Sequence, residues 1–386
     1  MPTSPVLDIA GLLHAVSDEA PAGPELRHGS KGDIRMFLAV RDARKKAIDA
    51  ERRLRDFASM SDDERSELGE TPDSPDWASV YRNAVEALGR SKDLWVAAWL
   101  IEAATRMNGF AGLRDGISLA HQLCETFWAD VHPQPEADQD MTTRFAQLAG
   151  LDGGGSAEGT LIVPLMDLQL TDARTVPSFS LADYRDALDL ERKPLEIRNR
   201  RLEQGVLSVA LCDQAVAETS MEFFRTRRED LEGALKAYSD FIGFLKEREV
   251  SVVASGGVAF VPPSSKIRDL LDECMRLCRA WGPKETAVGE PDGAGQTASS
   301  SESRANAGSF GDGNIRTREE AFETLLRVAG YFRSAEPHSP VSYALEQVVR
   351  WGRMSLPELL AELVSDQSAR EAVFLRTGIK GETPDQ

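Results

Sequence analysis

Apolar residues recur at spacings of three and four along most of this chain, which is the period of amphipathic helices. A thin apolar stripe made of Ile34, Phe37, Leu38, Ala47 and Leu54 predicts a long, charged helix from Asp33 to Phe57. A second helix is predicted from Trp77 to Leu88, and Gly89 follows it. Alternating runs of β-branched residues are scarce and aromatic residues make up 7% of the chain, so we expect an all-α fold.

The segment from Ser91 to Leu100 predicts the start of the next helix. Ser91 stands where an N-cap is expected, and Asp93 then falls in the first turn, at the positive end of the helix dipole. Trp95 and Trp99 are one turn apart and share a face. We expect them to pack in the core; the alternative is a groove for a partner, because Trp is enriched at interface hot spots.

This helix is expected to end near Gly109 and to be followed by another that ends before His132-Pro133. The second helix places Leu113, Ile117, Ala120, Cys124, Phe127 and Trp128 on one face. Short loops between helices of this length indicate antiparallel neighbours in a bundle.

Composition divides the chain into five parts. Residues 1–150 are expected to form an N-terminal helical domain, 151–178 a linker, and 179–281 a middle domain of two or three helices. A β-branched, glycine-containing stretch at 250–261 suggests a short extended insert within that domain, although the conformation of residues 250–262 is left open by the sequence. The remainder is predicted to be a disordered linker at 282–314 and a small C-terminal helical domain at 315–378.

The C-terminal domain contains a conspicuous helix break. Thr317 to Glu320 has the pattern of a capping box and starts a helix; Glu336, Pro337, His338, Ser339 and Pro340 then interrupt it. Ser339 is a predicted N-cap and Pro340 the first residue of the following helix. We expect this turn to set the angle between two helices of the C-terminal domain.

The net charge and the cysteine content indicate which classes of partner and which cellular compartment to expect. The net charge is −18, with 63 acidic and 45 basic residues, so nucleic acid and anionic lipid are disfavoured as partners. Four isolated cysteines suit reduced thiols. Because neither a signal peptide nor a transmembrane run is evident, a cytoplasmic protein without membrane insertion is expected.

Patterns for catalysis, metals and cofactors are absent from the sequence. The glycines of Asp152 to Ser156 lack the Lys-Ser/Thr of a phosphate loop, and Cys274 and Cys278 lack two further zinc ligands. Acidic pairs such as Asp62/Asp63 and Glu319/Glu320 lie at helix starts, where capping explains them. We therefore expect no catalytic, cofactor-binding or metal-binding residues; a helical enzyme with an unrecognised carboxylate site is the weaker alternative.

Three blocks of residues resemble the ImpA/TssA family of type VI secretion. The first is Pro21 to Arg27, which is similar to a P-x-G-x-x-L-R entry. The second is an ordered series of Trp77, Ser-Lys-Asp-Leu at 91–94, Gly109 to Leu113, Trp128 and His132-Pro133. The third is Tyr331 to Arg333 with the Glu336–Pro340 turn and Trp351. The candidate structural and partner-binding residues are Trp77, Ser91, Lys92, Asp93, Leu94, Trp95, Trp99, Gly109, Gly112, Trp128, Glu336, Pro337, His338, Ser339, Pro340 and Trp351.

The resemblance implies a cytoplasmic, non-enzymatic scaffold or cap protein. Family members contact the baseplate, a VgrG-like spike, and the Hcp tube or sheath, and promote tail assembly as ring-like homo-oligomers built through their C-terminal domains. The alternative within the same machine is a protein that stops or caps the sheath at its far end.

Overall fold

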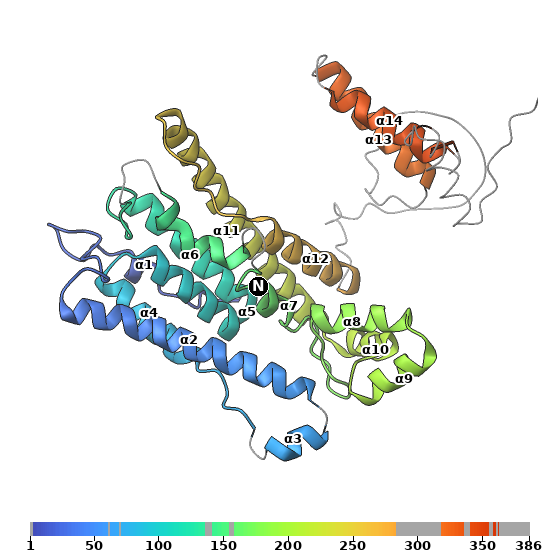
Figure 1. Ribbon diagram of the computed structural model, residues 1–386, viewed down its shortest axis with the longest axis horizontal. Coiled ribbons are helices and arrows are strands. Elements are labelled where there is room, and N and C mark those ends of the chain that lie inside the picture. The colour runs from blue at the N-terminus through green and yellow to red at the C-terminus, as the bar shows by residue number, and fades with distance from the viewer. Residues whose placement is uncertain are drawn as a thin grey trace, which may run out of the picture. The chain divides into compact units, whose positions relative to one another are not determined.

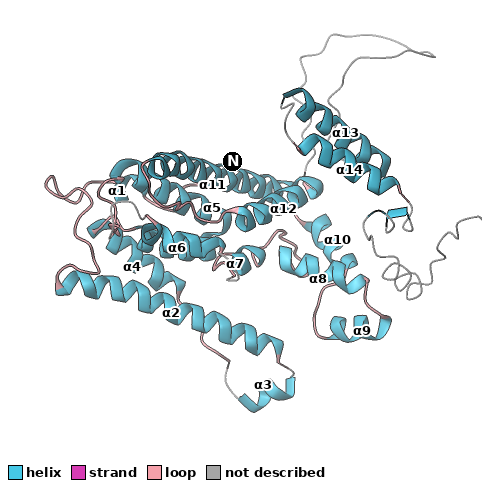
Figure 2. Cartoon of the chain, turned by 45° about the horizontal axis from the view of Figure 1, so that its top comes forward, coloured by secondary structure: helices cyan, strands magenta, loops and turns pink. Residues whose placement is uncertain are grey.

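The computed structural model describes residues 3–60, 62–68, 71–135, 141–153, 158–282, 318–335, 340–354, 358–359 and 362. Within these residues the chain is helical, with two isolated β-bridges and no strand, which confirms the all-α prediction (Figures 1 and 2). The helices are α1 Ile9–Leu12, α2 Lys31–Ser59, α3 Asp62–Leu68, α4 Trp77–Arg90, α5 Leu94–Phe127, α6 Thr142–Asp152, α7 Ile162–Met166, α8 Leu181–Glu191, α9 Leu195–Glu203, α10 Val209–Glu218, α11 Met221–Ala254, α12 Ser265–Trp281, α13 Arg318–Ala335 and α14 Val341–Arg353.

The chain divides into two compact units, Met1–Glu290 and Pro291–Gln386. Unit 1 contains α1 to α12, and unit 2 contains α13 and α14. No helix in the described part of either unit is both long and apolar enough to cross a membrane.

Helix α5 is a hairpin of two arms that meet at Gly109. That residue has a φ of +60°, which a glycine adopts without the cost of a side chain, and the helix break expected there is present. Gly112 lies so close to the first arm that a Cβ on it would be 1.9 Å from the carbonyl oxygen of Ala104. A Cβ on Gly116 would be 2.9 Å from Ile101, so the two arms run antiparallel.

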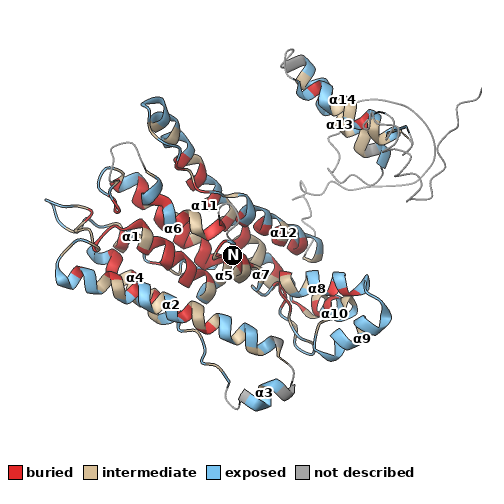
Figure 3. Ribbon diagram, in the orientation of Figure 1, coloured by how far each residue is buried: buried red, intermediate tan, exposed pale blue. Residues whose placement is uncertain are grey.

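The core of unit 1 is built around this hairpin. Helices α4, α6 and α11 pack against α5, and α12 packs against α11. Figure 3 shows α5 buried along most of its length. One continuous apolar cluster includes side chains from 1–150 and from 179–281, so the helices of both segments share a core in unit 1.

Helix α2 begins with a capping box and lies along α4. The Ser30 side chain accepts a hydrogen bond from the Asp33 amide, and the Asp33 carboxylate accepts one from the Ser30 amide, which is why the helix starts at Lys31 rather than at Asp33. Its C-terminal half has a smaller core of its own, made of Ala47 with Trp77, Val80 and Ala103.

The middle segment contains more helix than its sequence predicted. Helices α8 and α10 surround a small core of Phe179, Ala187, Cys212 and Ala215. Helix α11 continues through Val250 and Val253 to Ala254, so the expectation of an extended insert is wrong for the first half of 250–261. The helix propensity of Val is only a few tenths of a kcal/mol below that of Leu, and extending an existing helix costs little.

In unit 2, α13 and α14 pack against each other. Ala329 and Val349 are the buried apolar residues of this pair in the described part of the chain. The predicted break at Glu336 to Ser339 and the predicted linker after Gly282 lie outside the described residues.

Candidate structural and partner-binding site

The joint between α4 and α5 is capped by Asp93. Its carboxylate accepts hydrogen bonds from the amides of Trp95, at 2.8 Å, and Val96, at 3.4 Å. Ser91 is instead the C-cap of α4, with its amide donating to the Ala87 carbonyl. The prediction that Ser91 caps the next helix is therefore wrong, because α4 extends to Arg90 and uses the serine to end its own last turn.

Lys92 clamps two helix ends from within the core. The residue is 1% exposed, and its Nζ donates to the carbonyl oxygens of Leu12, at 2.7 Å, and Leu88, at 3.1 Å. Both carbonyls lie in the last turn of a helix, where no backbone donor is available. Burial lowers the pKa of the Lys92 ammonium, because removing the charged group from water costs free energy.

Backbone hydrogen bonds bring the first block of motif residues to this joint, together with the Ser-Lys-Asp-Leu and His132-Pro133 parts of the second block. The Lys92 amide donates to Ala22 in the lead-in, at 2.7 Å. The His132 amide donates to Lys92, and the Leu94 amide donates to His132, each at 2.8 Å. The His132 ring nitrogen Nε2 also lies 3.0 Å from the carbonyl oxygen of Gly23. The lead-in, the α4–α5 joint and the His132-Pro133 segment thus meet at one place.

The two tryptophans of the first α5 arm have different environments. Trp99 is buried beside Phe37, with 5.2 Å between ring centroids, and donates from Nε1 to Gln147. Trp95 is half-buried, and the guanidinium of Arg27 lies 4.2 Å from its ring. Core packing therefore accounts for Trp99, whereas part of Trp95 is accessible.

Trp128 closes the second arm of α5 and is fixed by a buried arginine. Arg144 donates to the backbone carbonyls of Trp128, at 2.8 Å, and Pro133, at 3.0 Å, and to the Gln134 side chain. The Trp128 ring also contacts Phe260, which ties the end of α5 to the segment after α11.

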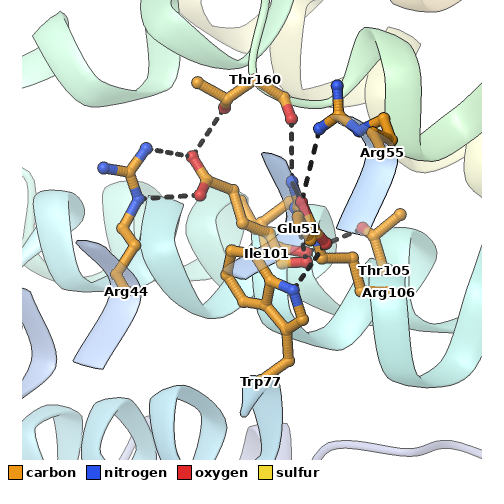
Figure 4. A network of polar contacts seen from close by, with 9 residues as sticks. Arg44, Glu51, Arg55, Trp77, Ile101, Thr105, Arg106 and Thr160 are labelled. Carbon is orange, nitrogen blue, oxygen red and sulfur yellow. Dashed lines mark hydrogen bonds and ion pairs between the residues drawn. The ribbon is translucent and has the colours of Figure 1, made fainter. Parts of the chain in front are cut away.

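Trp77 belongs to a polar network that the sequence did not suggest (Figure 4). Its Nε1 donates to Glu51 on α2, at 2.6 Å, and the guanidinium of Arg106 lies 3.9 Å from the centre of its ring. Arg106 in turn donates to Glu51, at 2.7 Å. These contacts hold the far half of α2 against α4 and the first arm of α5.

A second ion pair involves the buried carboxylate of Glu102. Arg44 donates two hydrogen bonds to it, each of 2.7 Å, and Thr160 donates a third, of 2.6 Å (Figure 4). Glu102 stands in the apolar run from Leu100 to Ala104, and a charge in such a run is the one sequence signal that marks it. All of these groups are satisfied by protein partners, which indicates a structural role.

The described residues hold no group of three or more His, Cys, Asp or Glu side chains arranged to bind a metal ion. The four cysteines are buried, and burial raises the pKa of Cys212 to about 11 and those of Cys274 and Cys278 to about 12. Thiols with such pKa values are protonated and unreactive near neutral pH. Pro340 precedes α14, and Trp351 lies within that helix. Glu336 to Ser339 lie outside the described residues.

Fold and site together define an all-α protein whose motif residues join helices to one another. Residues 13–153 match the sequence model of the ImpA N-terminal domain of the type VI secretion system. The whole chain is similar to the type VI secretion system component TssA1 of Pseudomonas aeruginosa, with 26% identity over 94% of this chain and 96% of that protein. Residues 13–153 thus carry an ImpA N-terminal domain, and the chain as a whole is similar to TssA components of type VI secretion systems.

A solved structure supports the same assignment. It is the N-terminal domain, including the conserved ImpA_N region, of the TssA component of the type VI secretion system from Burkholderia cenocepacia. That structure aligns with a TM-score of 0.53 and 26% identity, covering 73% of this chain and 96% of the solved one.

Proposed function

We propose that this protein is a cytoplasmic, non-enzymatic scaffold of a type VI secretion system. It binds baseplate, spike, tube and sheath components and promotes tail assembly. Unit 2 joins copies of the chain into a ring, so that copies of unit 1 are presented to partners at high effective concentration. The ImpA N-terminal domain, the similarity to TssA1 and the structural use of the motif residues support this role.

The exposed apolar surface of unit 2 is the observation that carries the proposal. Tyr331 and Tyr343 are 66% and 63% exposed, and Leu326, Val341 and Val348 are also exposed. Apolar side chains exposed on the described helices of unit 2, α13 and α14, are typical of a surface that packs against another protein chain. Copies of the same pair supply that partner surface in a ring, as symmetric oligomers do.

Light scattering on the purified full-length chain at micromolar concentration tests the ring. We expect a large symmetric oligomer, and a monomer would contradict the proposal. Tyr331→Glu combined with Tyr343→Glu should dissociate it, because two charges would be buried in the contact. Leu195→Glu, the same kind of change at an exposed residue of unit 1, is the matched control and should leave the mass unchanged.

Binding to purified baseplate, spike, tube and sheath proteins tests the role of unit 1. Recovery of baseplate and tube proteins is expected. Recovery of sheath proteins alone would instead assign the chain to the sheath end, and recovery of none would contradict a scaffold role.

A further inference from the structure

Arg227, on the first turns of α11, is half-buried and lies between two aromatic rings. Its guanidinium carbon lies 4.7 Å from the ring centre of Phe223, one turn earlier, and 5.7 Å from that of Phe110 on the second arm of α5. The two aromatic rings remove much of its water, and burial lowers the pKa of the guanidinium.

Arg227 has an unused donor in the described part of the protein. Its buried Nε has no hydrogen-bond partner there. Arg106 and Arg144, by contrast, are each bonded to carbonyl or carboxylate oxygens. The carboxylate of Asp230 nearby is occupied by the backbone and hydroxyl of Thr3. A desolvated guanidinium without an acceptor is costly, and an incoming anion offsets that cost.

Arg227 is half-buried, and its guanidinium lies beside the turn of the α5 hairpin. Gly109 has no side chain, and a Cβ placed on it would lie 3.6 Å from Nη1 of Arg227 and 4.0 Å from Leu168. Met107, two residues before the turn, is 46% exposed. A charged donor therefore lies beside a glycine at an accessible hairpin tip, with apolar side chains next to it.

We propose that Arg227 and the Gly109 turn bind the carboxylate of an acidic side chain on a partner protein. The planar guanidinium matches a carboxylate with two parallel hydrogen bonds, and Met107 and Leu168 contact apolar residues that flank the acidic one. A singly charged carboxylate suits this place better than a dianionic phosphate, because Asp230 lies three residues away on the same helix and the chain carries a net charge of −18. This site is independent of the proposed ring.

Selection of peptides on the full-length chain tests the site. A displayed library of random hexapeptides is enriched against the protein, and the strongest binder is synthesised with its acidic residue as Glu and as Gln. We expect the Glu peptide to bind at least about tenfold more tightly, since hydrogen bonds to charged groups contribute about 1.5–3 kcal/mol. Arg227→Gln should abolish the difference in affinity between the two peptides. Arg227→Lys should reduce it, because an ammonium cannot donate the two parallel hydrogen bonds of a guanidinium.

Arg225→Gln is the matched control, because Arg225 is an exposed arginine on the same helix whose ion pair is with Glu222. It should leave the Glu-to-Gln difference unchanged. Strongest binders without an acidic residue, equal binding of the two peptides, or equal losses in the Arg225 and Arg227 variants would each overturn the proposal. The charge of Asp172 raises the pKa of Arg227 and so acts on the guanidinium. A strong coupling between Arg227→Gln and Asp172→Asn in urea unfolding would also overturn the proposal, since Asp172 would then supply the carboxylate from within the chain.

Discussion

Arg44→Met is expected to destabilise unit 1 by about 3 kcal/mol. Arg44 supplies both 2.7 Å hydrogen bonds that neutralise the Glu102 carboxylate, whose side chain is only 2% exposed. Removing one partner of a buried ion pair costs about 3–5 kcal/mol, because the other charge stays buried and unpaired. The lower end applies here, since the Arg44 side chain is itself 19% exposed and water can enter its place.

Equilibrium unfolding in urea measures this loss, because urea is uncharged and leaves the ion pair unscreened. Tryptophan fluorescence reports on unit 1, which holds five of the six tryptophans. Lys45→Met, the neighbouring exposed position, is the control and should change the free energy of unfolding by less than about 0.5 kcal/mol. Adding Glu102→Gln to Arg44→Met should recover most of the loss. A cost below about 1 kcal/mol for Arg44→Met would refute the reasoning.

Three further changes test other parts of unit 1. Gly112→Ala should cost more than about 3 kcal/mol in thermal or urea unfolding, because its Cβ would overlap a carbonyl of the facing arm; a soluble variant with unchanged stability would exclude that contact. Asp93→Ala should lower the free energy of unfolding by about 1–2 kcal/mol, whereas Ser91→Ala should leave it nearly unchanged. A larger loss for Ser91→Ala than for Asp93→Ala would indicate that Ser91 is the N-cap of α5. Hydrogen bonds from Ser30 lower the pKa of Asp33, so the ionised carboxylate stabilises the folded state above about pH 4 and this stabilisation is lost as the pH falls through its folded-state pKa. Asp33→Asn should therefore make the free energy of unfolding less dependent on pH in the acid range.

Helical periodicity and glycine placement predicted the α5 hairpin, because both are local properties of the chain. The arms follow from apolar spacing, and the turn from Gly109, whose positive φ few other residues adopt. The N-cap of α5 could not be predicted from local sequence in the same way. Ser91 and Asp93 are both residues that favour the N-cap position, and only the length of α4 decides between them.

The polar networks could not be predicted, since their partners are distant in sequence. Glu102 meets Arg44 and Arg106 meets Glu51 across more than fifty residues of chain, and only the packing of α2 on the α4–α5 core determines these pairs. Arg227 gave no sequence signal either, because one arginine in the charged start of α11 is indistinguishable from its neighbours.

The hydrogen bonds at the α4–α5 joint also have a consequence for the local unfolding of unit 1. The amides of Lys92, His132 and Leu94 are bonded to Ala22, Lys92 and His132, respectively, so three distant segments depend on one another. These three protons should exchange with solvent at similar, slow rates, because each is exposed only when the whole joint separates. The lead-in from Leu12 to Ala22 is thus part of the cooperative unit, and its detachment would expose the buried Lys92 side chain to water.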